Sequence, residues 1–291
     1  MKIVIPAWGL GNVMFQYAFL CELRTRSKDG CCFVVHRRMK FDHQGYELDK
    51  LFKKVNPYKG LNLFQKAYIH TIEFLGGRGL PHYKLITWFF KEIWPKENFI
   101  FYEDIFQYGR KNCMLCGTWQ SLKYFEHVQS EVKETFTFDE KMLSPYTKEF
   151  LMRIIETSDS VSIHVRRGDY ASGNFDGFLL CCPIDYFKRA VEYMKAHLAH
   201  PVFYVFSDDI EYVREYFGEE NMVFIDGNRK EDSWQDMFLM SRCHHNIIAN
   251  STFSWWGAYL NAYNDKIVIA PKRWWYYFEK DDVVPESWLR M

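Results

Sequence analysis

The sequence has no excess of charge of either sign. Lysine plus arginine and aspartate plus glutamate each total 37, so the formal net charge is zero. Proteins that bind the phosphates of nucleic acids carry a basic excess or a broad basic stripe, so this composition does not indicate a nucleic-acid partner. Any anion-binding site must therefore be formed locally, by a few residues.

The eight cysteines lack the spacing of a disulfide framework or a zinc site. They include the adjacent pairs Cys31-Cys32 and Cys181-Cys182 and a single Cys113-x-x-Cys116 motif, with no histidine at ligand spacing. No Asp-x-Asp pair follows an expected strand, although the adjacent Asp208 and Asp209 keep a metal-bridged diphosphate as an alternative. We expect no metal site.

Long hydrophobic runs are also missing. The longest stretch without acidic or basic residues, between Arg242 and Asp265, contains many histidine, asparagine, serine and threonine residues and is too polar to span a bilayer. Residues 1–6 already have the pattern of a folded strand, which leaves no room for a signal peptide. We expect a cytoplasmic protein without an integral membrane anchor.

Apolar segments alternate with amphipathic ones in the second half of the chain, and the first half opens in the same way. A length of 291 residues allows two modest domains. Strands that alternate with helices predict parallel sheets, so we expect an α/β protein with domains 1–155 and 156–291. The expected strands are 2–7, 31–35, 114–116, 161–165, 202–206, 222–226, 246–249 and 266–270, and the expected helices are 13–27, 183–198, 210–217, 233–243 and 253–262.

Two adjacent arginines follow the strand expected at 161–165, in the stretch SIHVRRGDY. Because strand residues alternate faces, His164 and Arg166 should project to one side of the sheet and Arg167 to the other. A guanidinium group at the carboxyl end of a strand suits a phosphate. The alternative is an ion pair that closes the strand, such as Arg167 with Asp169.

Two more polar segments lie between an expected strand and an expected helix. The first contains Ser207, Asp208 and Asp209. One of these should cap the helix, which leaves an acid free to accept hydrogen bonds from a nucleobase or a ribose hydroxyl. The second offers hydroxyl and amide groups at a helix start, which is a natural phosphate cradle, and its members are Asn250, Ser251, Thr252 and Ser254. We expect Trp255 and Trp256, which follow, to pack the helix.

The first expected strand is followed by a Gly9-Leu-Gly11-Asn12 turn. Glycines let a backbone approach a ligand, although a purely structural turn is the alternative. Ligands of parallel sheets gather at the carboxyl ends of the strands. The segments together therefore predict a site for a nucleotide diphosphate, held by Arg166, the Asp208 turn and the helix start at residues 251–254.

These segments resemble the successive motifs of the bacterial α-1,2-fucosyltransferases of glycosyltransferase family 11. The matching stretches are HVRRGDY from His164, FSDDI from Phe206, NSTFSWWGA from Asn250, GLGNVMFQY from Gly9 and GTWQSLKYF from Gly117. The resemblance implies a GT-B-like fold, in which two Rossmann-like domains with parallel sheets face a cleft. It also implies GDP-L-fucose as donor, no required metal, and inverting transfer to the 2-hydroxyl of a galactose-terminated oligosaccharide.

Residue roles follow from this resemblance as expectations. The first domain should bind the acceptor and the second the donor. Arg166 should stabilise the leaving phosphate with help from His164, Asn12 and the helix start at Ser254, and Gly11, Arg167 and the two polar segments should contribute to donor binding. Asp169 is the expected general base, with Asp176 as the alternative.

The chain departs from the family pattern near its start. Trp8 stands where the pattern has glycine, and Val13 stands where it has glutamine, so a polar contact is lost or is supplied by Gln16. The open alternatives are another GDP-sugar or linkage, or a non-catalytic protein that binds nucleotide sugars or glycans. We expect a cytoplasmic location, with peripheral attachment to the inner membrane face as an option.

Overall fold

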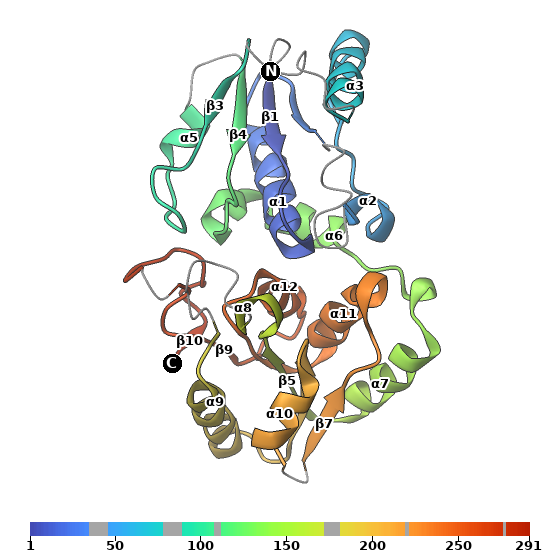
Figure 1. Ribbon diagram of the computed structural model, residues 1–291, viewed down its shortest axis with the longest axis vertical. Helices are drawn as coiled ribbons and strands as arrows, with labels where there is room; N and C mark the ends of the chain where they lie inside the picture. Colours follow the sequence, from blue (N-terminus) through green and yellow to red (C-terminus); the bar gives the residue numbers. More distant parts are fainter. Residues whose placement is uncertain (35–45, 78–88, 108–111, 172–180, 219–220, 276–277) are drawn as a thin grey trace. The chain divides into compact units, whose positions relative to one another are not determined.

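The computed structural model describes residues 1–34, 46–77, 89–107, 112–171, 181–218, 221–275 and 278–291 (Figure 1). The chain forms two compact units, Met1–Phe138 and Asp139–Met291. Each has its own parallel sheet, which confirms the expected α/β class. In the described ranges, no helix is long and apolar enough to cross a membrane.

The division between the units falls before the expected position at residue 155. The cause is helix α7 (Pro145–Glu156), which buries Thr147, Phe150 and Ile154 within the second unit and packs against a helix of that unit, α11 (Trp234–Arg242). The helix begins at Ser144, whose hydroxyl accepts a hydrogen bond from Thr147 N at 3.1 Å, and it has proline in its first turn. The cap fixes the start of the helix, and its packing on α11 makes α7 an element of the second unit.

The first unit contains a four-stranded sheet in the order β2-β1-β4-β3, with all strands parallel. In this order β1 and β4, which are far apart in sequence, lie side by side, and Ile5 pairs with Cys116 at their carboxyl ends. The strands are β1 Lys2–Ile5, β2 Cys31–Phe33, β3 Lys91–Ile93 and β4 Cys113–Cys116. The helices are α1 Leu10–Arg26, α2 Leu48–Leu51, α3 Leu63–Gly77, α5 Asp104–Gln107 and α6 Gln129–Thr135, with a 3-10 helix η2 at Leu122–Val128.

The second unit contains a six-stranded parallel sheet in the order β10-β9-β8-β5-β6-β7. Its strands are β5 Asp159–Val165, β6 Pro201–Ser207, β7 Met222–Ile225, β8 His245–Ile247, β9 Val268–Ala270 and β10 Leu289–Arg290. Its helices, besides α7 and α11, are α8 Gly168–Ala171, α9 Ile184–His197, α10 Ile210–Tyr216 and α12 Thr252–Leu260, with 3-10 helices η3 Glu140–Met142 and η4 Lys230–Asp232.

The strand order of the second unit reverses direction next to β5. From β5 the chain adds β6 and β7 on one side and then returns to add β8, β9 and β10 on the other. In sheets of this kind the crevice beyond the carboxyl ends at the reversal is where ligands bind. The topology therefore predicts a ligand site at the residues that follow β5 and β8.

Alternate residues of β5 face different layers of helices. Val161, Ile163 and Val165 belong to a buried apolar cluster with side chains of α9 and α10. On the opposite face, Ser162 accepts a hydrogen bond at 2.7 Å from Asn246 of β8, which also donates to Met240 O of α11 at 2.8 Å. This alternation confirms that His164 and Val165 point to opposite faces.

Candidate active site

The three polar segments of the second unit follow three neighbouring strands. The arginine segment follows β5, the Ser207 segment ends β6, and the Asn250 segment follows β8, with β5 lying between the other two strands. Parallel strands place their carboxyl ends at one edge of the sheet. The expected convergence of the three segments is therefore present.

Arg166 is held at the end of β5 by Asp208. Its Nη1 lies 2.8 Å from Asp208 Oδ2, while Asp208 Oδ1 accepts the backbone N–H of Arg167, also at 2.8 Å. Asp208 is therefore not the spare acid that the sequence suggested, because both of its oxygens act on the arginine segment. The Arg166 side chain retains 31% exposure, so its guanidinium is oriented yet still accessible to an anion.

Arg167 lies on the other face of β5, where it braces the turn. Its Nε donates to Asp209 Oδ2 at 3.0 Å, and its guanidinium carbon lies 3.3 Å from the ring centre of Tyr212. Asp209 also caps α10 by accepting Tyr212 N. An ion pair at the end of the strand is therefore present, with Asp209 as the partner of Arg167.

Two further residues shape this turn. Ser207 donates to Val165 O at 2.8 Å and accepts Asp209 N at 3.0 Å, so its hydroxyl ties the ends of β5 and β6 together. A side chain on Gly168 would place its Cβ 2.5 Å from Asp208 Oδ2. Only glycine lets Asp208 approach this closely. No role was predicted for Gly168 from the sequence, although its position directly after two arginines could have indicated a tight turn.

His164 is buried beside Arg166. The ring centre lies 5.8 Å from that of Phe253, and Nδ1 has no hydrogen-bond partner among the described residues. Burial, and secondarily the Arg166 cation, lowers the pKa of His164 from 6.5 to about 3. The imidazole is therefore neutral at pH 7, and any help it gives to a leaving phosphate comes as a hydrogen bond rather than as a positive charge.

Replacement of His164 by asparagine should flatten the pH dependence of stability. The unfolded chain binds a proton at His164 below pH 6.5 and the folded chain does so only near pH 3, so the folded state is fully favoured above pH 6.5 and loses stability as the pH falls. Between pH 7 and 5 the wild type should lose about 2 kcal/mol more than the variant. Urea unfolding at both pH values measures this, and equal losses would contradict the neutral buried histidine.

The helix start after β8 is the third part of this edge. Helix α12 begins after Ser251, whose side chain makes no capping hydrogen bond, and its first turn contains no acidic residue. Ser254 is fully buried and donates to Ser251 O at 3.3 Å, and Asn250 accepts from the thiol of Cys182 at 3.3 Å. The Thr252 side chain is half-buried. Trp255 and Trp256 are fully buried, which confirms their packing role.

The two candidates for the general base are placed differently. Asp169 belongs to the short helix α8, directly after the arginine turn. Asp176 lies outside the described residues. The base therefore stays a prediction.

The first unit presents its own motifs at the carboxyl ends of β1 and β4. The turn after β1 leads through Gly9 into α1, whose first turn contains Gly11 and Asn12, and Asn12 accepts a hydrogen bond from Gln120, which follows β4. Gln16 is fully buried, accepts Ala7 N at 3.0 Å and donates to Gly117 O at 2.8 Å. Its amide thus joins the two strands, and it is not a free replacement for the glutamine missing at Val13.

Two tryptophans follow the paired ends of β1 and β4 with the same unusual backbone. Trp8 lies three residues after Ile5 and Trp119 three residues after Cys116, and their φ angles are +64° and +51°. A left-handed backbone costs a bulky residue about 1–2 kcal/mol. Trp119 is buried and stacks on Phe19, with ring centres 4.5 Å apart. Trp8 is 48% exposed, and within the described ranges its indole makes no hydrogen bond or ring contact.

Glycine substitutions at the two tryptophans should have different effects on stability. Trp119→Gly should lower the free energy of unfolding by about 3–5 kcal/mol, because it empties a packed aromatic site. Trp8→Gly should change it by no more than about 1 kcal/mol, because the relief of backbone strain offsets the greater freedom of glycine in the unfolded chain. Urea titration compares them, and an equally large loss for Trp8→Gly would show that its indole stabilises the fold.

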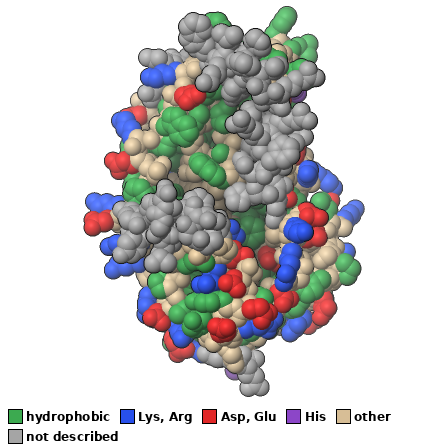
Figure 2. All heavy atoms as spheres, viewed as in Figure 1, with side chains coloured by type: hydrophobic (Ala, Val, Ile, Leu, Met, Phe, Trp, Pro, Cys, Tyr) green, Lys and Arg blue, Asp and Glu red, His purple; other side chains and the backbone are tan. Residues whose placement is uncertain are grey.

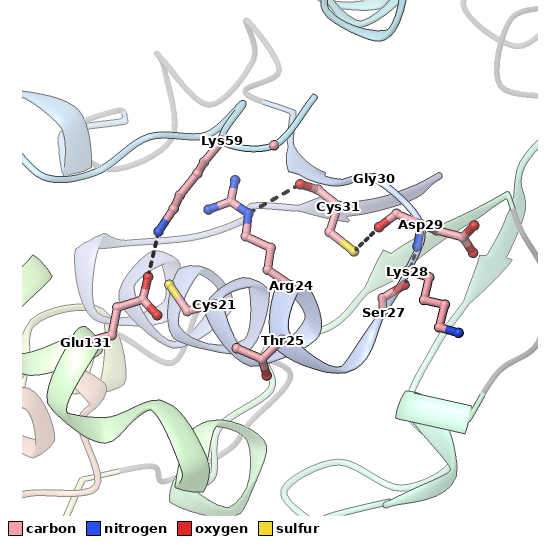
Figure 3. A pocket seen from close by; sticks show the side chains of 11 residues that line it. Cys21, Arg24, Thr25, Ser27, Lys28, Asp29, Gly30, Cys31, Lys59 and Glu131 are labelled. Carbon is pink, nitrogen blue, oxygen red and sulfur yellow. Dashed lines mark hydrogen bonds and ion pairs between the residues drawn. The ribbon is translucent and has the colours of Figure 1, made fainter. Parts of the chain in front are cut away.

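A cavity of about 390 Å³ lies at the other end of the first sheet (Figure 3). It is lined by the last turns of α1 and by residues that lead into β2. Two of its cations are already engaged, because Arg24 donates to backbone carbonyls and Lys59 pairs with Glu131 at 3.1 Å. On the face shown in Figure 2, basic and acidic side chains of the second unit are interspersed. The carboxyl edges of the two sheets are therefore better candidate sites than this cavity or this surface.

The chain is similar in sequence to known glycosyltransferases. The family model for glycosyl transferase family 11 matches residues 78–290. An alpha-1,2-colitosyltransferase of Escherichia coli is 33% identical, with 100% of this chain and 99% of the relative covered. The O-antigen biosynthesis glycosyltransferase WbnK of Escherichia coli is 30% identical, with 97% and 98% covered.

More distant proteins match parts of the chain or its fold. The galactoside alpha-(1,2)-fucosyltransferase 1 of Homo sapiens is 27% identical over 52% of this chain and 43% of its own length. The structure of an Arabidopsis thaliana FUT1 mutant in complex with GDP aligns with a TM-score of 0.50 at 12% identity, covering 92% of this chain and 69% of the other. At that identity the likeness shows the fold alone, which is of the GT-B type.

Proposed function

Since this chain belongs to glycosyltransferase family 11, we propose that it transfers L-fucose from GDP-L-fucose to the 2-hydroxyl of a terminal β-galactose in an oligosaccharide or glycan. The observation that carries the proposal is Arg166, oriented by Asp208 at the point where the strand order of the second sheet reverses. An accessible guanidinium at such an edge suits the diphosphate of a nucleotide sugar. Relatives named as α-1,2-fucosyl and α-1,2-colitosyl transferases support the sugar and the linkage.

The leaving group explains why an oriented cation is needed. When the bond between fucose C1 and the β-phosphate oxygen breaks, the electron pair stays with GDP and positive charge develops on the sugar ring. Donors that are already in place stabilise the new phosphate charge without reorganisation. Arg166 supplies the charge, neutral His164 and the N–H groups at the start of α12 supply hydrogen bonds, and Asp208 keeps Arg166 in position.

Inversion requires the acceptor hydroxyl to attack the opposite face of the ring. As the new bond from its oxygen to fucose C1 forms, its proton must pass to a base. We propose the Asp169 carboxylate for this step, because it follows the anion-binding turn within α8. Donor binding is proposed for Asn250, Ser251 and Thr252 in the second unit and for Gly11 and Asn12 in the first, while Arg167, Asp209 and Ser207 contribute by holding the turn that presents Arg166.

A second donor is favoured by one finding. The relative at 33% identity is named a colitosyltransferase, and colitose is L-fucose without its 3-hydroxyl group. A site that hydrogen-bonds a substrate hydroxyl rejects an analogue that lacks it by about 10⁴-fold or more. The donor preference should therefore be large in one direction, which makes it simple to measure.

Parallel assays with GDP-fucose, GDP-colitose and GDP-mannose, each with a panel of β-galactosides, test the proposal. Release of GDP is followed together with the mass added to the acceptor. The proposal predicts that GDP-fucose is the preferred donor and that a deoxyhexose is added. Preference for GDP-colitose would change the sugar, preference for GDP-mannose would refute a deoxysugar donor, and binding without turnover would indicate a non-catalytic protein.

A further inference from the structure

Trp8 is the feature of the first unit that its own fold does not explain. It has the same left-handed backbone as Trp119 at the equivalent position after the neighbouring strand. In Trp119 the buried, stacked indole compensates for that backbone. In Trp8 the indole is 48% exposed and has no ring or hydrogen-bonding partner within the described ranges. Glycine at position 8 would allow the same backbone without steric strain.

The position of Trp8 suggests what uses the exposed ring. It lies between β1 and α1, at the sheet edge where Asn12 and Gln120 also lie. An exposed indole presents a flat apolar face with an electron-rich surface. The C–H groups on one face of a pyranose ring fit such a surface, and amide side chains nearby can bond to sugar hydroxyls. The edge thus has groups that can bind a carbohydrate ring.

We propose that Trp8 forms an acceptor subsite, on which a sugar ring of the galactose-terminated acceptor stacks. This inference rests on the proposed function for the identity of the sugar. It adds acceptor recognition on the aromatic edge of the first unit to recognition of the donor diphosphate on the cationic edge of the second. Trp8 then sets acceptor affinity and choice without taking part in the bond exchange.

The test compares Trp8→Ala and Trp8→Phe with Phe64→Ala. Phe64 is a matched control because it is an 89% exposed aromatic residue near the opposite end of the same sheet, where its neighbour Gln65 lies next to Gly30. With GDP-fucose and lactose, Trp8→Ala should raise the KM for lactose by about tenfold or more, which corresponds to the loss of about 1.4 kcal/mol. The KM for GDP-fucose and the limiting kcat should change by less than about twofold. Trp8→Phe should keep most of the affinity, and Phe64→Ala should match the wild type.

Saturation-transfer NMR with lactose or N-acetyllactosamine separates the subsite from the proposed reaction. Signal transfer to the galactose ring in the wild type, lost in Trp8→Ala and kept in Phe64→Ala, supports the subsite even if GDP-fucose is not turned over. A wild type that transfers fucose while Trp8→Ala keeps its lactose KM within about twofold overturns the inference alone. Absence of signal transfer to either sugar in the wild type also overturns it. Absence of turnover with GDP-fucose overturns the proposed function instead.

Discussion

Replacement of Arg166 by alanine should reduce fucose transfer from GDP-fucose by about 10²-fold to 10³-fold or more, because the charge that develops on the leaving phosphate loses its oriented cation. The folded state should persist. Arg166 is partly exposed, and Asp208 would still accept the backbone N–H of Arg167 at 2.8 Å. Steady-state assays with saturating acceptor measure the loss, and thermal unfolding measures the fold.

Two variants make the Arg166 result specific. Arg242→Ala removes another arginine of the same unit, one whose ion pair at 2.6 Å joins it to Glu140, and it should leave the rate unchanged. Asp208→Asn keeps the cation but weakens its brace, so its activity should lie between those of the wild type and Arg166→Ala. Near-normal turnover by a folded Arg166→Ala protein would remove Arg166 from the mechanism.

Replacement of Asp169 by asparagine should lower kcat by about 10²-fold to 10⁴-fold, because the acceptor hydroxyl loses its proton acceptor. The affinity for GDP should stay within a few-fold of the wild-type value, since the proposed role concerns the acceptor. Rates come from steady-state assays, and GDP affinity comes from calorimetric titration.

Asp176→Asn is the matched comparison for Asp169→Asn. It makes the same chemical change seven residues further along the chain. A normal rate for Asp176→Asn and a slow rate for Asp169→Asn would identify Asp169 as the base. The reverse pattern would transfer the role to Asp176, and loss of GDP binding in Asp169→Asn would give that residue a part in holding the donor turn.

The carboxyl edge of the second sheet could be predicted because local signals determine it. Short apolar runs end abruptly at polar residues, and alternating strands and helices imply parallel pairing. The structure confirms the expected strands within a few residues and places the segments after β5, β6 and β8 on neighbouring strands. The opposite orientations of His164 and Arg167 also followed from strand alternation.

The features that could not be predicted depend on tertiary contacts. Asp208 reaches Arg166 across an interval of 42 residues, and His164, whose burial keeps it neutral, lies beside Phe253 of α12, far along the chain. The division at Phe138 depends on the packing of α7 against α11. A tryptophan side chain does not indicate a left-handed backbone, so the positive φ of Trp8 could not be predicted from that residue. The glycine that the family pattern has at this position was the only hint.

The linkage in the reaction product tests the proposed function most directly. The purified protein is incubated with GDP-β-L-fucose and lactose, and the trisaccharide is examined by two-dimensional NMR. We expect a single new α-fucosyl residue joined to the 2-hydroxyl of galactose, with release of one GDP for each bond formed. A β-linked fucose, attachment at another hydroxyl, or release of GDP without a trisaccharide would contradict it.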